Sequence, residues 1–151
     1  MATYQSILHK AADAINYAFG SIAGADLPSC TRYLDDGIDD ISLPAVVISC
    51  TAETLADPTG TVSSENFRVT VNISAESMAD TSDTSRTVHG QLAGIVEAVF
   101  FRSADQVVTE CNAAGVTDFT AERWTPLSIT QEKEPERRRT ILSGALICTS
   151  R

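Results

Sequence analysis

The first hydrophobic positions of the chain recur with the period of a helix. Apolar residues spaced three and four positions apart form one stripe over residues 3–22, which predicts an amphipathic helix. Gly20 and Gly24 loosen its end. A polar connection rich in turn formers follows over residues 24–42. The stripe consists of Ile7, Leu8, Ala11, Ile15, Ala18, Phe19 and Ile22.

Two strands are predicted next. Residues 43–51 (LPAVVISCT) form a short apolar run of β type, and a loop over residues 56–64 follows it. Residues 65–76 alternate, which predicts one buried face and one face in contact with water. The buried face carries Phe67, Val69, Val71, Ile73 and Ala75, and the wet face carries Arg68, Thr70, Asn72, Ser74 and Glu76.

A second helix is expected after these strands, with Asp80 and Ser82 as candidate N-caps. Ser103 and Gln106 have the spacing of a capping box that opens a short third helix, and Gly115 is suited to end it. The apolar stripe of the second helix is Val88, Leu92, Ile95, Val96 and Val99, and it ends at Phe100 and Phe101.

The last two strands are predicted at residues 117–131 and 138–149. Pro126 lies within the first of them, which indicates an edge strand or a bulge. The final strand has little polar surface on either face, so we expect it to be buried on both sides. Its second cover would come from loops or from another subunit.

The order of elements is therefore α-β-β-α-α-β-β within a single domain spanning residues 1–151. Adjacent strand pairs favour hairpins and a four-stranded antiparallel sheet, with a mixed sheet left open. Two main helices pack on one face of this sheet, which is an α+β architecture.

The charge of the chain is unevenly distributed. The net charge is −9, but residues 1–122 hold 17 acids and 5 bases, whereas residues 123–151 hold 3 acids and 6 bases. The resulting balances of −12 and +3 would let the end of one copy meet the body of another. These charge balances argue against a broad nucleic-acid-binding surface, because neutralising phosphates requires clustered Lys and Arg.

The four cysteines, at positions 30, 50, 111 and 148, show neither metal-ligand spacing nor C-x-x-C spacing. Cys50 and Cys148 fall in apolar runs and are expected to be small buried hydrophobes, in a reducing cytoplasm. We expect no signal peptide and no membrane span, because the N-terminus lacks a basic region and no apolar run approaches ~18 residues.

Candidate catalytic and metal-binding residues are few. His9 and Asp13 stand four positions apart on the first helix, where a surface pair is the favoured interpretation, and His89 is predicted to flank the second helix. No P-loop, G-x-S-x-G or G-x-G-x-x-G motif occurs, so neither an enzyme nor a bound cofactor is expected.

An acidic loop surrounds Gly37. Its carboxylates could bind Ca²⁺ or Mg²⁺ loosely, and an enzyme built on Asp and Glu alone would have its pocket here. The EF-hand spacing is absent, so a solvated loop is favoured, with contact to a partner left open. The loop contains Asp35, Asp36, Asp39 and Asp40.

A charged segment, residues 132–139 (EKEPERRR), joins the last two strands. Strand alternation places Arg137 and Arg139 on one face and Arg138 on the other. Their guanidinium groups suit carboxylate pairing, and the acidic loop of a neighbouring copy is a natural counterpart. A solvated hairpin tip is the alternative. The predicted contact residues are Glu132, Glu134, Arg137, Arg138, Arg139, Asp35, Asp36, Asp39 and Asp40.

The layout resembles a known family. A leading amphipathic helix, the strands LPAVVIS and FRVTVNIS, a helix entered through an Asp/Ser/Thr cluster, and the closing segment SITQEKEPERRRTILSGALICTS are similar to tail terminator (tail-completion, or minor tail) proteins of long-tailed bacteriophages and related contractile-tail particles. The resemblance implies a virion protein, assembled in the host cytoplasm, that forms a hexameric ring. Such a ring ends the tail tube, presents a surface to the head or neck, and lets DNA pass through without specific binding.

Two alternatives remain open at this stage. One is another head–tail connector or neck protein, which would share the small α+β ring-forming layout. The other is a monomeric or dimeric protein-binding module, whose acidic body would capture a cationic partner and which would form no ring.

Overall fold

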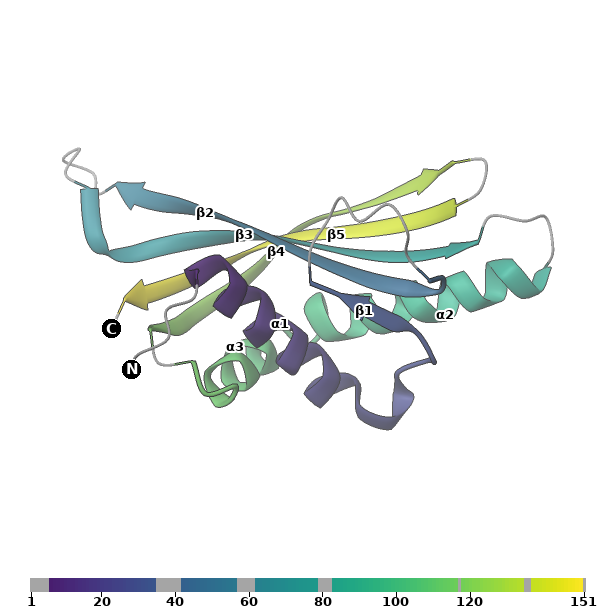
Figure 1. Ribbon diagram of the computed structural model, residues 1–151, viewed down its shortest axis with the longest axis horizontal. Helices are drawn as coiled ribbons and strands as arrows, with labels where there is room; N and C mark the ends of the chain where they lie inside the picture. The colour runs from purple at the N-terminus through teal and green to yellow at the C-terminus, as the bar shows by residue number, and fades with distance from the viewer. Residues whose placement is uncertain are drawn as a thin grey trace.

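The computed structural model is an α+β fold in which a five-stranded mixed sheet carries three helices on one face (Figure 1). The structure describes residues 6–34, 42–56, 62–78, 83–116, 118–134 and 137–150. The elements are α1 (Ile7–Ala23), a 3-10 turn (Gly24–Asp26), β1 (Thr31–Tyr33), β2 (Ala45–Ala56), β3 (Val62–Met78), α2 (Asp83–Phe100), α3 (Ala104–Ala113), β4 (Phe119–Lys133) and β5 (Arg137–Ser150).

The strands lie in the order β1-β2-β3-β5-β4, with β1 parallel to β2 and all other pairs antiparallel. The α+β class is confirmed, but the four-stranded sheet and the order α-β-β-α-α-β-β are wrong because both omit β1. This strand has three residues and no apolar periodicity. The β1 strand forms because it pairs with β2, and Thr31 donates its N–H to the carbonyl of Pro44 at 3.1 Å.

The first helix, α1, packs its buried stripe against the sheet. Its N-cap Ser6 accepts the N–H of Leu8 at 3.2 Å, and Gly24 ends it with a φ of 54°. Gly20 has a role beyond loosening the helix end, because a Cβ there would lie 2.8 Å from Nη1 of Arg32 on β1. The absence of a side chain at Gly20 thus leaves room for the end of the Arg32 side chain, which donates to the carbonyl of Asn16 at 3.4 Å.

The other two helices begin differently from the prediction. The candidate N-caps Asp80 and Ser82 lie outside the described residues. The capping box at Ser103 is wrong, because its side chain makes no capping bond and its carbonyl instead accepts the N–H of Gln106 at 3.0 Å. Gly115 follows the end of α3 with a φ of 85°, as a helix stop requires.

The β4 strand lies at an edge of the sheet, and its register with β5 shifts between Pro126 and Ser128. The predicted edge position and bulge are both confirmed. The shift suits proline, which has no N–H to donate to a ladder.

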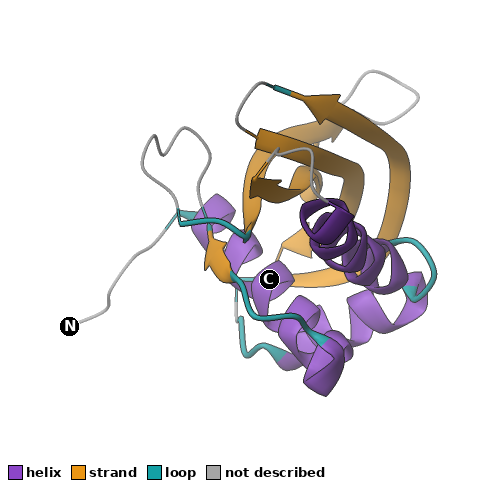
Figure 2. Ribbon diagram, turned by 90° about the vertical axis from the view of Figure 1, so that its right-hand side faces the viewer, coloured by secondary structure: helices purple, strands orange, loops and turns teal. Residues whose placement is uncertain are grey.

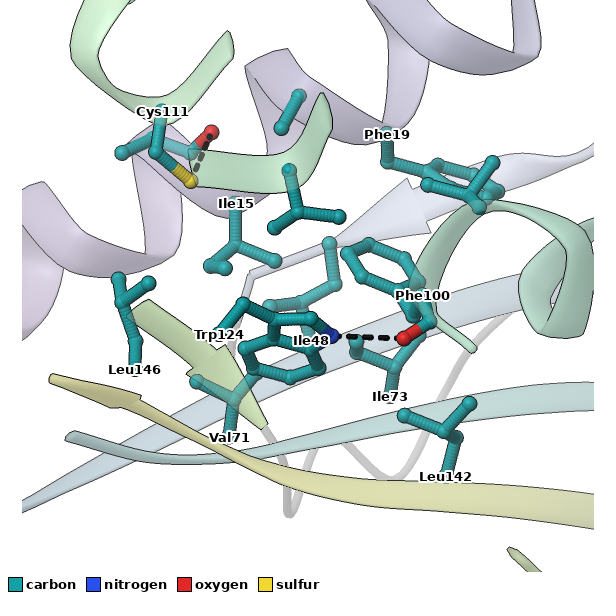
Figure 3. Packing of buried hydrophobic residues seen from close by; sticks show 14 of the residues in the cluster. Ile15, Phe19, Ile48, Val71, Ile73, Phe100, Cys111, Trp124, Leu142 and Leu146 are labelled. Carbon is teal, nitrogen blue, oxygen red and sulfur yellow. Dashed lines mark hydrogen bonds between the residues drawn. The ribbon is translucent and has the colours of Figure 1, made fainter. Parts of the chain in front are cut away.

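The core lies between the helices and the sheet (Figure 3). Trp124 of β4 reaches into it and donates its indole N–H to the carbonyl of Phe100 at 2.7 Å. Phe100 in turn stacks on Phe19 of α1, with ring centroids 5.6 Å apart. This aromatic series ties together α1, α2 and the edge strand.

Among the described residues, no helix lies on the opposite face of the sheet, and Figure 2 shows that the sheet is curved. On the helix side of β5, Leu142 and Leu146 are fully buried. On the other side Ala145 is buried, but Ile141 and Ile147 are only half-buried. Within the single chain, the described loops and helices do not fully cover these two isoleucines, so burial of β5 on both sides by its own chain is wrong for them. Cover by another subunit stays a prediction.

Candidate interaction site on the β4–β5 hairpin

Two backbone hydrogen bonds connect the end of β4 to the start of β5. Glu134 donates its N–H to the carbonyl of Arg137 at 2.8 Å, and the N–H of Arg137 returns to the carbonyl of Glu134 at 3.4 Å. Pro135 and Glu136, between them, lie outside the described residues. The ladder then continues directly into the pair Lys133 and Arg138. The charged segment is therefore built into a regular hairpin.

A buried carboxylate organises the charges on the face without helices. Oε1 of Glu76 accepts Nη1 of Arg137 at 2.9 Å and Nε of Arg139 at 3.1 Å, and Nη1 of Arg139 also donates to Glu134 at 3.2 Å. The side chain of Glu76 is only 6% exposed, whereas those of Arg137 and Arg139 are 23% and 29% exposed. We call Glu76, Glu134, Arg137 and Arg139 the Glu76 cluster. Its charge-assisted bonds fix the hairpin to β3.

The alternation of the arginines is confirmed, since Arg137 and Arg139 share the Glu76 face. Glu76 itself lies on the predicted face of β3, but the expectation that it contacts water is wrong. The two arginines that cover it come from β5, more than sixty positions along the chain. No local pattern around Glu76 carries that information.

A second polar cluster lies on the helix side of the same strands. His89 of α2 bonds through Nδ1 to Oγ of Ser77 at 2.6 Å and through Nε2 to Oγ1 of Thr140 at 2.9 Å. All three residues are buried. Burial lowers the pKa of His89, and the positive charge of Arg138 lowers it further. His89 thus bridges α2, β3 and β5, and its prediction as a helix-flank residue is wrong because it is buried.

The remaining predicted contact residues do not lie together in the described part of the chain. Glu132 is exposed on β4, in register with Arg139. Arg138 points to the helix side, away from the Glu76 cluster, because it pairs with Ser77 in the ladder. The four aspartates of the acidic loop lie outside the described residues: Asp35, Asp36, Asp39 and Asp40.

The other candidate groups show little sign of reactivity. Burial raises the pKa of Cys50, Cys111 and Cys148 to about 12, so these thiols stay protonated. Among the described residues, no three His, Cys, Asp or Glu side chains are grouped to hold a metal ion. Within the same part of the chain, no helix is long and apolar enough to cross a membrane.

Comparison with known proteins gives no further assignment. No protein-family model matches this chain, and neither does any curated protein sequence.

Proposed function

We propose that this chain is a structural virion protein, a tail terminator whose copies form a ring that caps the tail tube and joins it to the head or neck. The observation that carries the proposal is the β4–β5 hairpin. Its outer strand is exposed at every position from Leu127 to Glu134. Its turn end is held to β3 by the Glu76 cluster.

The build of the hairpin favours protein–protein contact. A strand pair held by a buried carboxylate loses little conformational freedom when it binds, so less of the binding energy is spent on ordering it. The arginines retain partly exposed guanidinium groups, and Lys133 and Glu132 are exposed beside them. Charges of both signs at a contact fix its register and its partner more than its affinity.

The parts of this proposal that concern the ring and the tail tube are based on the resemblance of the sequence to the tail terminator family. Head-to-tail contacts between identical subunits close into a ring when the rotation fits, and we expect six subunits. The tube protein below and the neck or connector protein above are the other partners. A net charge of −9 suits a lumen that DNA crosses without being held, because like charges repel.

The test is native mass spectrometry of the full chain across concentration and salt, followed by electron microscopy with purified tail tubes. A discrete hexamer, or density confined to tube ends, is the expected result. A chain that stays monomeric and leaves tube ends bare would overturn the proposal in favour of the acidic binding module. A ring that binds purified necks but no tube would indicate the connector function.

A further inference from the structure

The outer edge of β4 is protected along its first part. The side chain of Asn112 on α3 accepts the N–H of Ala121 at 2.8 Å and donates to its carbonyl at 3.0 Å. The side-chain amide of Asn112 thus makes the two backbone hydrogen bonds with Ala121 that a neighbouring strand would make. Further along, Pro126 and its bulge interrupt the edge. Such devices keep sheet edges from pairing with other chains.

The next part of the same edge has no such protection. All side chains from Leu127 to Glu132 are exposed, and Leu127 and Ile129 are 61% and 41% exposed. Within the described residues, β5 is the only strand that pairs with β4. No lysine, proline or further register shift occurs before Lys133. The stretch spans roughly 20 Å at the rise of a β-strand.

We propose that residues 127–132 of β4 pair with the β1 edge of a second copy of this chain. This inference rests on the proposed ring. The two outer strands of the sheet, β1 and β4, run in opposite directions. When copies stand side by side in the same orientation, β4 of one therefore meets β1 of the next as an antiparallel pair. The contact is head-to-tail and repeats around a ring.

Charge and exposure also favour a second copy. Residues 119–150 hold 4 acids and 5 bases, a balance of +1, whereas residues 1–118 hold 16 acids and 5 bases, a balance of −11. The hairpin is thus the part of the chain that can approach the acidic body of another copy with least repulsion. Thr31 and Arg32 on β1 are exposed, and among the described strands only β2 pairs with β1.

The first experiment changes the bare edge. The double variant Leu127→Lys, Ile129→Lys places charges on it, and Met78→Lys is the matched control, since Met78 is 62% exposed on β3. By native mass spectrometry we expect the double variant to need at least tenfold more protein to assemble, with the control unchanged. Hydrogen exchange of wild-type protein should show that the alternate amides within 127–132 that point away from β5 are protected only in the assembled state.

The second experiment identifies the partner strand. Cys30 directly precedes β1 and is half-buried, so a short bismaleimide should link it to Ser128→Cys of another copy. Peptide mapping should find this Cys30 link, and Cys30→Ser should abolish it. Links between two copies of position 128 alone would mean that β4 pairs with β4, which overturns the proposal.

The outcomes separate the edge contact from the ring. Suppose that wild-type protein forms rings, that the double variant assembles equally well, and that assembly does not protect the outward amides at 127–132. This result would overturn the edge contact and leave the ring intact. Wild-type protein that forms no ring, alone or on tail tubes, would overturn the proposed function and the edge contact together.

Discussion

The indole ring of Trp124 lies across Gly144 on the neighbouring strand. A Cβ at position 144 would stand 2.6 Å from Cζ2 of Trp124 and 3.0 Å from the carbonyl oxygen of Thr125. The glycine therefore creates the space in which the ring packs, and the ring covers backbone that the glycine leaves bare. This pair lets the edge strand β4 join the core through the bond from Trp124 to Phe100.

Gly144→Ala should therefore lower the free energy of unfolding by ~1–3 kcal/mol, the usual cost of overpacking a core. Urea denaturation followed by tryptophan fluorescence measures this directly, because Trp124 is the only tryptophan. Gly94→Ala is the matched control, since a Cβ there meets nothing within 4 Å. In the middle of α2 it should be stabilising by up to ~1 kcal/mol. Equal effects of the two substitutions would contradict the packing account.

Glu76 should contribute more to the free energy of unfolding than Glu134, the other carboxylate of its cluster. Glu76→Gln keeps the shape but leaves Arg137 and Arg139 without their shared charge, and we expect a loss of ~1.5–3 kcal/mol. Glu134→Gln, half exposed at 50%, should cost under ~1 kcal/mol. Guanidinium chloride would mask these ion pairs, so urea is the denaturant to use. Similar losses for both variants would show that burial of Glu76 does not strengthen its bonds.

The four cysteines should divide into one reactive thiol and three slow ones. Cys30 is half-buried and near Arg32, which partly offsets the rise that burial causes in its pKa. Cys50, Cys111 and Cys148 have a pKa of about 12. With a thiol-specific chromogenic reagent at pH 8 we expect Cys30 to react quickly. Cys50 is also half-buried but should react slowly because of its high pKa, and Cys111 and Cys148 should react only on denaturation. Cys30→Ser should abolish the fast phase, and a fast phase that survives would refute the assignment.

The sequence predicts those features that depend on local pattern. The stripe around Ile15, the alternation around Val71 and the proline at 126 each specify an element or an irregularity through neighbours in the chain. The face of Arg137 and Arg139 follows from the same period of two. These features need no knowledge of which strands pair.

The features that the sequence did not reveal depend on distant partners. The burial of Glu76 comes from arginines on β5, and the burial of His89 comes from hydroxyl groups on β3 and β5. The β1 strand exists because β2 offers it an edge. Taken from the sequence alone, Glu76, His89 and residues 31–33 are typical of an exposed surface or a loop. Their burial or their strand conformation arises only when the sheet assembles.

The stability of the fold should depend on pH through His89. Its pKa is lowered in the folded protein from the ordinary value of 6.5, by burial first and by Arg138 second, and Lys133 lies in register with Arg138. The unfolded chain therefore takes up a proton near pH 6.5 that the folded chain resists. The free energy of unfolding should fall as pH drops below about 6.5, by at most ~1.4 kcal/mol per pH unit, and level off below the lowered pKa.

The measurement compares urea denaturation at pH 7.5 and 5.5 for wild type and His89→Gln. The variant should be less stable at pH 7.5, because its amide cannot bond Ser77 and Thr140 with the geometry of the ring, but it should lose less stability on acidification. His9→Gln removes the exposed histidine of α1 and should retain the wild-type difference. If His89→Gln and wild type lose the same free energy between these pH values, the buried histidine does not couple protonation to folding. Acid would then act on the fold through its carboxylates instead.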